Sequence, residues 1–339
     1  MSLLLLQDTM KQSDLAAMSE RSRKTFYNPG FIVVKPTSLS VNAYRLLRNI
    51  TAKSKVTNDM RALTRAIQML KTQKSGINAT FLNKHIYMNG KQYFEVTKRL
   101  LPRAHDPCSS IQKINCSVLV VHNNWIVGKE AKIYRFREHL MWLYDGEDQY
   151  YSSQTRRYIT YTNPNPVVLN GRLGLSDDKQ SAKRQLSALI TALSIGYMLN
   201  RVVIIPKFYC STGIQCPLNS LIHIRTFDAI FSNQYRENSF VQHPRVPYAV
   251  KQSLSNQRVF LAATHSQFAE KVHTITSSDI IKLFRNAKDK VINFGSLDGI
   301  HVKFSSHSTG TAFNERIRNA FKPSDYKQFN VGSFMWLKP

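Results

Sequence analysis

Negative charge is scarce in this sequence. Its 339 residues include 21 Asp and Glu against 47 Lys and Arg, so the formal net charge is +26. A positive field of this size favours polyanionic partners: nucleic acid, an anionic membrane or a phosphate-bearing ligand. The basic residues are dispersed, and the sequence shows no zinc spacing, RNA-recognition pattern or basic helix. The charge is therefore the only feature that supports a nucleic-acid-binding protein. Since no recognition motif accompanies it, we expect no nucleic-acid partner.

Long hydrophobic runs are also missing. The apolar stretch 188–206 is broken by Asn200 and Arg201, and its pattern predicts a helix followed by a strand. The short apolar run near the start lacks the basic region and the small-residue cleavage site of a signal peptide. The second half contains neither an HExxH sequence nor a nucleophile elbow. The sequence thus shows no transmembrane helix and none of these hydrolase signatures.

Cysteine is rare, and no CxxC pair occurs. The four cysteines form two local pairs, which suits two small disulfide loops in an oxidising compartment. Four reduced and partly buried thiols are the alternative. Three N-glycosylation sequons favour the oxidising compartment. The cysteines are Cys108 and Cys116, then Cys210 and Cys216; the acceptors are Asn49, Asn78 and Asn115.

The residues that are present predict an α/β protein. Hydrophobic residues make up 42% of the chain and charged residues 20%, which is globular composition. Short buried strands at 31–34 and 118–121 alternate with amphipathic helices, one of them capped by Thr57 or Asn58. Three short strands, 80–82, 86–88 and 92–94, surround the turn signal Asn89-Gly90. A helix starting near Ser176 runs into a β-branched strand at 201–206.

A composition change suggests where the chain divides. The stretch 146–157 is polar and rich in tyrosine, and the following 163–166 reads Asn-Pro-Asn-Pro. Such a stretch disfavours regular structure. We therefore place one domain at 1–150 and a second α/β domain at 151–339.

One segment combines features of a ligand site. It reads VHNNWIVGKEAKIYRF and follows a short apolar run. His122 would then lie at the carboxyl edge of a sheet, where ligands of α/β proteins bind. Lys129 and Lys132 fall in the first turn of a helix, where the helix dipole disfavours cations by ~0.3–1 kcal/mol each. A bound phosphate would reverse that penalty, although a solvated basic face and a hydrogen-bonded His122 explain the pattern equally simply.

Two further segments carry candidate residues. Asn28 and Gly30, in YNPGF, mark a turn that would let a ligand approach the backbone, or an ordinary Asn-Pro-Gly turn. Asp59 opens a helix, where its charge suits the dipole and simple capping accounts for it.

The order of these segments resembles the nucleotide-diphospho-sugar transferases of glycosyltransferase family 77. The stretches that carry the resemblance cover about 10–145 and have the family's order of motifs. They are YNPGFIVVKPT, VTNDMRALTRAI, ATFLNKHIYMNGKQYF and VHNNWIVGKEAKIYRFREHLMWL. The opening of the second half, KRQLSALITALSIGYMLNRVVIIPKFYC, is similar to the helix–strand start of fucosyltransferase-like domains, and no catalytic residue follows from it.

The resemblance implies a Rossmann-like GT-A domain that transfers a sugar, with retention, from a nucleotide-diphospho-sugar to a glycan or protein acceptor. It implies a divalent cation, expected to be Mn²⁺, contacted by His122. The family's Asp-x-Asp motif and nucleoside-binding half would lie before residue 10, so we expect an incomplete GT-A domain, and whether this chain alone is active stays open. A Golgi-lumen location with an upstream membrane anchor is also implied. A non-catalytic lumenal binding module is the alternative.

By the same resemblance, individual residues take roles. Asp59 is similar to the family's acidic residue near the donor sugar and is the catalytic candidate. The remaining candidates would contact the donor sugar or its diphosphate. They are Asn28, Gly30, Asn124, Gly128, Lys129 and Lys132.

Overall fold

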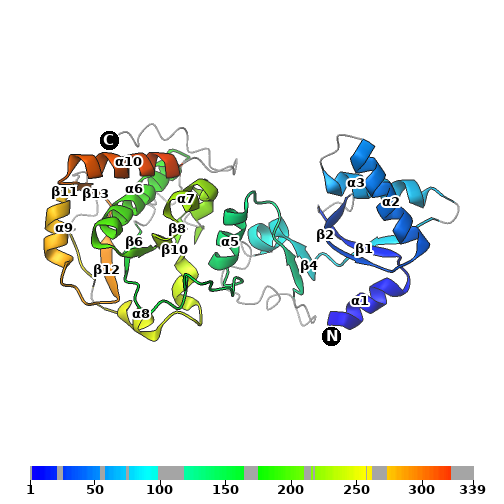
Figure 1. Cartoon of the computed structure of the whole chain (residues 1–339), viewed down its shortest axis with the longest axis horizontal. Coiled ribbons are helices and arrows are strands. Elements are labelled where there is room, and N and C mark those ends of the chain that lie inside the picture. Colours follow the sequence, from blue (N-terminus) through cyan, green and yellow to red (C-terminus); the bar gives the residue numbers. More distant parts are fainter. Residues whose placement is uncertain are drawn as a thin grey trace. The chain divides into compact units, whose positions relative to one another are not determined.

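The described residues of the computed structural model form two compact units, Met1–Val127 and Gly128–Pro339. Figure 1 shows both, and each is treated by itself. The composition change at 146–166 falls inside the second unit. The predicted domains 1–150 and 151–339 stay a prediction. The structure describes residues 2–20, 26–53, 58–73, 76–97, 118–163, 175–209, 215–216, 218–256, 258–261 and 273–321.

The first unit is built on a small sheet in which β1 is central. Strand β2 pairs with β1 antiparallel, β3 pairs with it parallel, and β4 pairs in parallel with β5. A π-helical segment, Lys91–Thr97, follows β4. The elements are α1 (Ser2–Lys11), β1 (Leu15–Ser19), β2 (Tyr27–Val34), α2 (Ser38–Lys53), α3 (Asp59–Lys71), β3 (Ala79–Phe81), β4 (Tyr87–Asn89) and β5 (Val120–His122).

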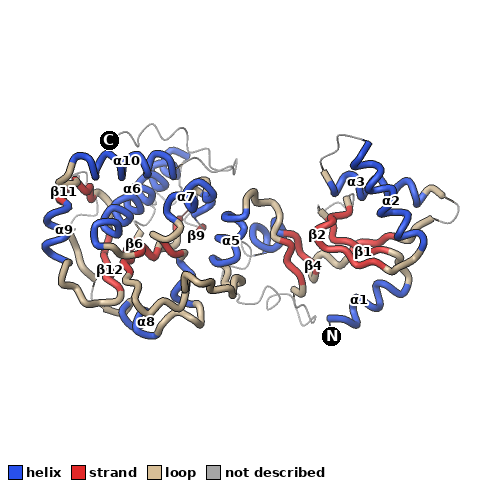
Figure 2. The backbone as a smooth tube through the Cα atoms, viewed as in Figure 1, coloured by secondary structure: helices blue, strands red, loops and turns tan. Residues whose placement is uncertain are grey.

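Strand β1 is buried on both faces because its alternate side chains enter two cores. Leu15 and Ala17 pack into a core that contains residues of α2 and α3. Ala16 and Met18 enter a second core with residues of α1 and β4. A strand sends successive side chains to opposite faces, so a short run of small apolar residues can serve two layers. Figure 2 shows the strands of this unit lying between helices.

Helix α3 begins directly after Asn58, one of the two capping residues predicted from the sequence. The side chain of Asn58 accepts a hydrogen bond from the backbone N–H of Arg61, which satisfies one of the free donors of the first turn. Ala62, Leu63, Ala66, Ile67 and Leu70 are buried along one face. The alternative cap, Thr57, lies outside the described residues.

The hairpin predicted around Asn89-Gly90 is wrong. Strand β4 ends at Asn89 and pairs in parallel with β5, and the expected strand at 92–94 lies within the π-helical segment. The reason lies in two side-chain contacts. Asn89 Oδ1 accepts from the backbone N–H of Gln92 at 2.9 Å, and Gly90 N–H donates to Asn124 Oδ1 at 2.7 Å. Asn89 therefore starts a helical turn instead of closing a hairpin.

The second unit contains a four-stranded parallel sheet of order β10-β7-β6-β12. The chain enters at β6, adds β7 and β10 on one side, and then places β12 on the other, which is the doubly wound arrangement. Its strands and helices are β6 (Tyr158–Thr162), β7 (Val202–Ile204), β8 (Phe208–Tyr209), β9 (Gln215–Cys216), β10 (Tyr235–Arg236), β11 (His273–Thr276), β12 (Val291–Ser296), β13 (Ile300–Lys303), α5 (Lys129–Glu138), α6 (Leu175–Leu199), α7 (Ile224–Phe231), α8 (Tyr248–Ser253), α9 (Ser277–Phe284) and α10 (His307–Ala320).

The predicted step from helix to strand near residue 200 is confirmed. Helix α6 ends at Leu199, Asn200 takes the left-handed conformation with φ 50°, and β7 starts at Val202. Asn tolerates that conformation better than most residues, which suits a helix end. At Gly196, a Cβ would lie 2.7 Å from the carbonyl oxygen of Arg201, so only glycine lets the helix end pack this closely on the strand. With parallel strands and helices in both units, the α/β class is confirmed.

No helix among the described residues is both long enough and apolar enough to pass through a membrane.

Candidate functional site

Polar side chains gather where three strands of the first unit end. Glu20 follows β1, Asn89 ends β4, and His122 ends β5 directly opposite Asn89. The Nδ2 of Asn89 donates to the backbone carbonyls of Ser19 and Glu20, at 3.2 Å each, which brings the ends of β1 and β4 together. The carboxyl ends of such strands are where α/β proteins bind ligands. We call this group, completed by Asn28 and Asn124, the strand-end cluster.

A carboxylate lies at the middle of the strand-end cluster. Glu20 accepts from the Nδ2 of Asn28 and from the Nδ2 of Asn124, the latter 3.2 Å from Oε2 and 3.4 Å from Oε1. Hydrogen bonds to an ionised carboxylate are stronger than those between neutral groups. Two segments far apart in the sequence are thereby tied to one charge, and the amides of Asn28 and Asn124 are held in fixed orientations.

Gly30 lets the His122 imidazole approach the backbone. A Cβ at Gly30 would lie 1.9 Å from Cε1 of His122, which no real contact allows. Asn28 and Gly30 lie within β2, and Oδ1 of Asn28 accepts from Gly30 N–H at 2.8 Å. The predicted turn is therefore a bulge, since the register with β1 skips three residues between Asn28 and Ile32. We expected a ligand to approach the backbone at Gly30; in the structure the imidazole of His122 occupies that position.

Trp125 adds an aromatic surface next to the strand-end cluster. Its φ of 59° is unusual for a bulky residue, and 42% of its surface is exposed. The ammonium of Lys91 lies 5.1 Å from the centre of its ring. Strained residues occur preferentially at functional sites. The sequence did not predict Trp125, Glu20 or Asn89 as residues of the site.

The described residues do not provide a complete cation site. The strand-end cluster offers one carboxylate, Glu20, whose oxygens already accept amide hydrogens, and one imidazole, His122. Across the described part of the chain, no group of three or more His, Cys, Asp or Glu side chains is placed to hold a metal ion. Hard divalent cations take several oxygen ligands. A metal site does not fit these residues alone.

The other predicted contacts lie elsewhere in the chain. Asp59 is exposed at the start of α3, and its Oδ1 accepts from the N–H of Met60, a bond within the first turn. Lys129 and Lys132 are exposed in the first turn of α5, in the second unit, as the sequence predicted. Gly128 precedes that helix with φ 94°. The same turn also contains Glu130, 3.8 Å from Nε of Arg225, so a negative charge already lies near the helix start.

Most residues predicted for disulfides cannot be placed. Cys108, Cys116 and Cys210 lie outside the described residues, as does the acceptor Asn115, and Cys216 is located only as part of β9. Asn49 and Asn78 are exposed. Both are accessible positions for a glycan.

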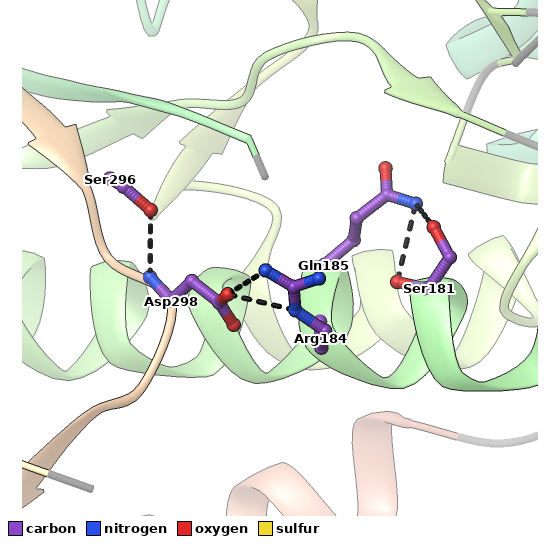
Figure 3. Close-up of polar contacts among 5 residues, drawn as sticks. All are labelled: Ser181, Arg184, Gln185, Ser296 and Asp298. Carbon is purple, nitrogen blue, oxygen red and sulfur yellow. Dashed lines mark hydrogen bonds and ion pairs between the residues drawn. The ribbon is translucent and has the colours of Figure 1, made fainter. Parts of the chain in front are cut away.

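The second unit has its own carboxyl edge, where β6 and β12 lie next to each other. Arg184, from α6, forms an ion pair with Asp298, just after β12, and its Nε donates to Oδ2 at 2.8 Å (Figure 3). The N–H of Asp298 donates to Ser296 Oγ at 3.2 Å. Gln185, the next residue of α6, donates from Nε2 to Ser181, one helix turn earlier (Figure 3). In doubly wound sheets the order of strand addition reverses between two such strands, and ligands commonly bind at that switch point.

A buried charged cluster lies beside β10 in the same unit. The guanidinium carbons of Arg137 and Arg236 lie 3.5 Å and 3.9 Å from the centre of the Tyr150 ring. The Tyr150 hydroxyl donates to Glu237 Oε2 at 2.6 Å. Burial, helped by the nearby Glu237, raises the pKa of Glu138 to about 8, and burial also raises the pKa of Glu237. These carboxyls therefore hold protons more tightly than exposed ones do.

Comparison with known proteins confirms the resemblance predicted from the sequence. Residues 5–136 match the family model of nucleotide-diphospho-sugar transferases. The chain is also 21% identical over 246 residues to the arabinosyltransferase XEG113 of Arabidopsis thaliana, a match that covers 61% of this chain. The chain spans 38% of that relative's length. No solved structure matches the chain significantly. The matched segment contains the whole strand-end cluster, and glycosyltransferase family 77 is consistent with both findings.

Proposed function

We propose that the chain is a sugar transferase whose first unit contacts a nucleotide-diphospho-sugar, with the strand-end cluster facing the donor sugar. One observation carries the proposal: the carboxylate of Glu20, which follows β1, accepts hydrogen bonds from the amides of Asn28, in β2, and Asn124, just after β5. A carboxylate and oriented amides suit sugar hydroxyls, which both donate and accept hydrogen bonds. The family match over residues 5–136 supports the same class of reaction.

Each residue of the site has a distinct part in this proposal. Glu20 would accept from a sugar hydroxyl while Asn28 and Asn124 hold its carboxylate in place. The exposed face of Trp125 would pack against the apolar C–H face of a sugar ring. The imidazole of His122, supported against Gly30, would contact the donor diphosphate or a divalent cation that is bound with it. Asp59 remains the catalytic candidate from the resemblance.

Finer features of the reaction also belong to the proposal. We propose retention of configuration, transfer to a glycan or protein acceptor, and a Golgi-lumen location. The name of the Arabidopsis relative makes an arabinose donor the first to test. The exposed acceptors Asn49 and Asn78 suit a lumenal protein. A shift in electrophoretic mobility after removal of N-linked glycans from the expressed chain tests the location.

Donor binding by the full chain is the direct test. Calorimetry with nucleoside diphosphates and their arabinose conjugates, with and without Mn²⁺, should show binding that Glu20→Gln weakens at least tenfold. Glu147→Gln, at an exposed position of the second unit, is the matched control and should bind normally. If Glu20→Gln, Asn124→Ala and His122→Ala all bind donor like the parent chain, the site assignment is wrong.

The sequence-based assignment of the two lysines is tested separately. Replacing Lys129 and Lys132 together by Gln should weaken binding of the nucleoside diphosphate itself, whether or not a sugar is attached. Donor binding without any transfer to water or to acceptor would instead favour the non-catalytic binding module.

A further inference from the structure

A pocket of about 680 Å³ opens at the amino edge of the sheet in the second unit. It lies between the end of α6, the starts of α9 and α10, the first residue of β7 and the two residues before β10. This is the edge opposite the one where Arg184 and Asp298 meet. Its lining therefore shares no residue with the strand-end cluster or with the contact between Arg184 and Asp298 at the switch point of the doubly wound sheet.

Aromatic and apolar side chains form one wall of this pocket. Tyr197 is 45% exposed, and its ring centre lies 6.4 Å from that of Phe304. Ile281, 43% exposed, continues the apolar wall. Large apolar side chains at the mouth of a pocket suggest a ligand with an apolar face.

Hydroxyl groups also line the pocket. Ser277 Oγ donates to Ser305 Oγ at 3.0 Å, and Thr309 Oγ1 donates to Ser306 Oγ at 3.1 Å. Each hydroxyl offers one donor and two acceptor positions, and after the bonds to neighbouring groups Ser277, Ser305 and Thr309 each keep acceptor capacity for a ligand hydroxyl. Side-chain amides line it too: Gln234 Oε1 is buried and accepts no hydrogen bond from the described residues. Asn200 and Asn233 line the same pocket.

The lining of the pocket is nearly neutral. Among the described residues that line it there is no carboxylate, and their one cation, Arg201, donates to the carbonyls of Tyr158, Asp289 and Ala287. The two helix starts are also occupied. Thr276 and Ser306 accept from the first-turn N–H groups of α9 and α10. Arg316, whose guanidinium carbon lies 5.8 Å from the centre of the Tyr197 ring, donates to the carbonyl of Ile230. Among the described lining residues, a phosphate would find neither a guanidinium without carbonyl partners nor an uncapped helix end.

We infer that this pocket binds a neutral saccharide. A sugar ring has an apolar C–H face for Tyr197 and hydroxyls for the serine, threonine and amide wall. An uncharged ligand also matches the absence of carboxylates. The volume suits a unit of one to three sugar residues, within the range of small-ligand pockets. The inference concerns a binding site and holds whether or not the first unit transfers sugar.

Titration of the full chain with neutral oligosaccharides tests the inference. An array of pentose, hexose and deoxyhexose di- and trisaccharides would be screened by saturation-transfer NMR, and inorganic phosphate and a nucleoside diphosphate would serve as charged probes. We expect at least one neutral saccharide to bind. Tyr197→Ala should weaken that binding at least tenfold, and Thr309→Val should weaken it several-fold. Asn233→Trp, an exposed position at the pocket wall, should block it.

Matched variants separate the site from general damage. Thr311→Val lies on the same helix as Thr309 but outside the pocket, and Tyr248→Ala removes an exposed tyrosine elsewhere; both should bind like the parent chain. Thermal unfolding would verify that every variant is folded. The inference is overturned if no neutral saccharide binds, if the folded Asn233→Trp chain still binds, or if the charged probes bind here instead.

Discussion

Polar and charged side chains lie at the carboxyl ends of strands in both units, but the two units differ in which groups they use and how deeply they bury them. In the first unit, the strand ends carry neutral amides and one carboxylate, and the bonds run between strands. In the second unit, guanidinium groups and carboxyls are buried together, with Arg236 and Glu237 both at 0% exposure. The comparison suggests that charge in the second unit serves folding, whereas the first unit keeps an adaptable hydrogen-bonding surface beside an exposed tryptophan.

This difference has an energetic basis. A buried ion is costly unless several partners compensate it, so such a cluster tolerates little change. Hydrogen bonds to a carboxylate contribute about 1.5–3 kcal/mol each, less than the ~3–5 kcal/mol lost when one partner of a buried ion pair is removed, so individual losses are tolerable. The two edges should therefore respond differently to substitution: stability should be lost in the second unit and ligand binding in the first.

The largest effect is expected for Arg236→Ala. Its guanidinium donates to the carbonyls of Tyr150 and Tyr235 and lies over the Tyr150 ring. Removal leaves those carbonyls without their donor and takes a nearby positive charge away from the buried Glu237 carboxyl, which should lower the free energy of unfolding by ~3–5 kcal/mol. Denaturant titration measures the loss, and Arg258→Ala, at an exposed position, should change stability by less than ~0.5 kcal/mol. Equal effects of the two substitutions would remove the contrast between the units.

A second large effect should depend on pH. The pKa of Glu138 is about 8 in the folded chain and about 4.5 when exposed, so the folded state holds the proton more tightly between these values. Its stabilising contribution is complete below pH 4.5 and is lost as pH rises through 8, at no more than ~1.4 kcal/mol per pH unit. Glu138→Gln should flatten this slope, seen as a higher melting temperature than the parent chain at pH 8. Glu147→Gln should leave the slope unchanged.

An intermediate effect is expected in the first unit. Gly30→Ala places a Cβ against the imidazole of His122 and should cost ~1–3 kcal/mol of stability, the usual range for overpacking. Because the clash is with one side chain, His122→Ala should remove most of that cost. A double-mutant cycle by denaturant titration measures the coupling. Additive losses would show that the imidazole is not the obstacle.

Local pattern was enough to predict much of the fold and some of the site. Asn58 caps α3 as predicted, and the run 201–206 contains β7, because caps and β-branched runs depend on neighbours in sequence. His122, Asn28 and Asn124 were each predicted as site residues. The sequence did not predict that Asn28 and Asn124 both bind Glu20. Glu20 follows β1, and the small residues of that strand, LAAM, do not resemble a β-strand. The flanking Asp14 and Glu20 around that apolar run are the signal that could have identified it.

Parallel pairing accounts for the rest of what the sequence could not predict. Asn89-Gly90 has the local signature of a hairpin, yet β4 pairs with β5, more than thirty residues later in the chain. That choice depends on Asn124 binding Gly90 N–H, a contact no local pattern contains. The aromatic ring of Trp125 likewise reaches its place only through a backbone conformation that its sequence does not favour.

The smallest change in stability is expected for Trp125→Asn. Asn tolerates a φ near 59° better than Trp does, so relief of strain should offset the lost contact with Lys91. The free energy of unfolding should therefore stay within ~1 kcal/mol of the parent chain. Binding of the nucleotide-diphospho-sugar should nonetheless weaken several-fold, while binding of the nucleoside diphosphate alone should not change. Normal binding of both by a stable Trp125→Asn chain would mean that the strained tryptophan has no part in sugar recognition, and the first unit would lose its aromatic surface for the donor.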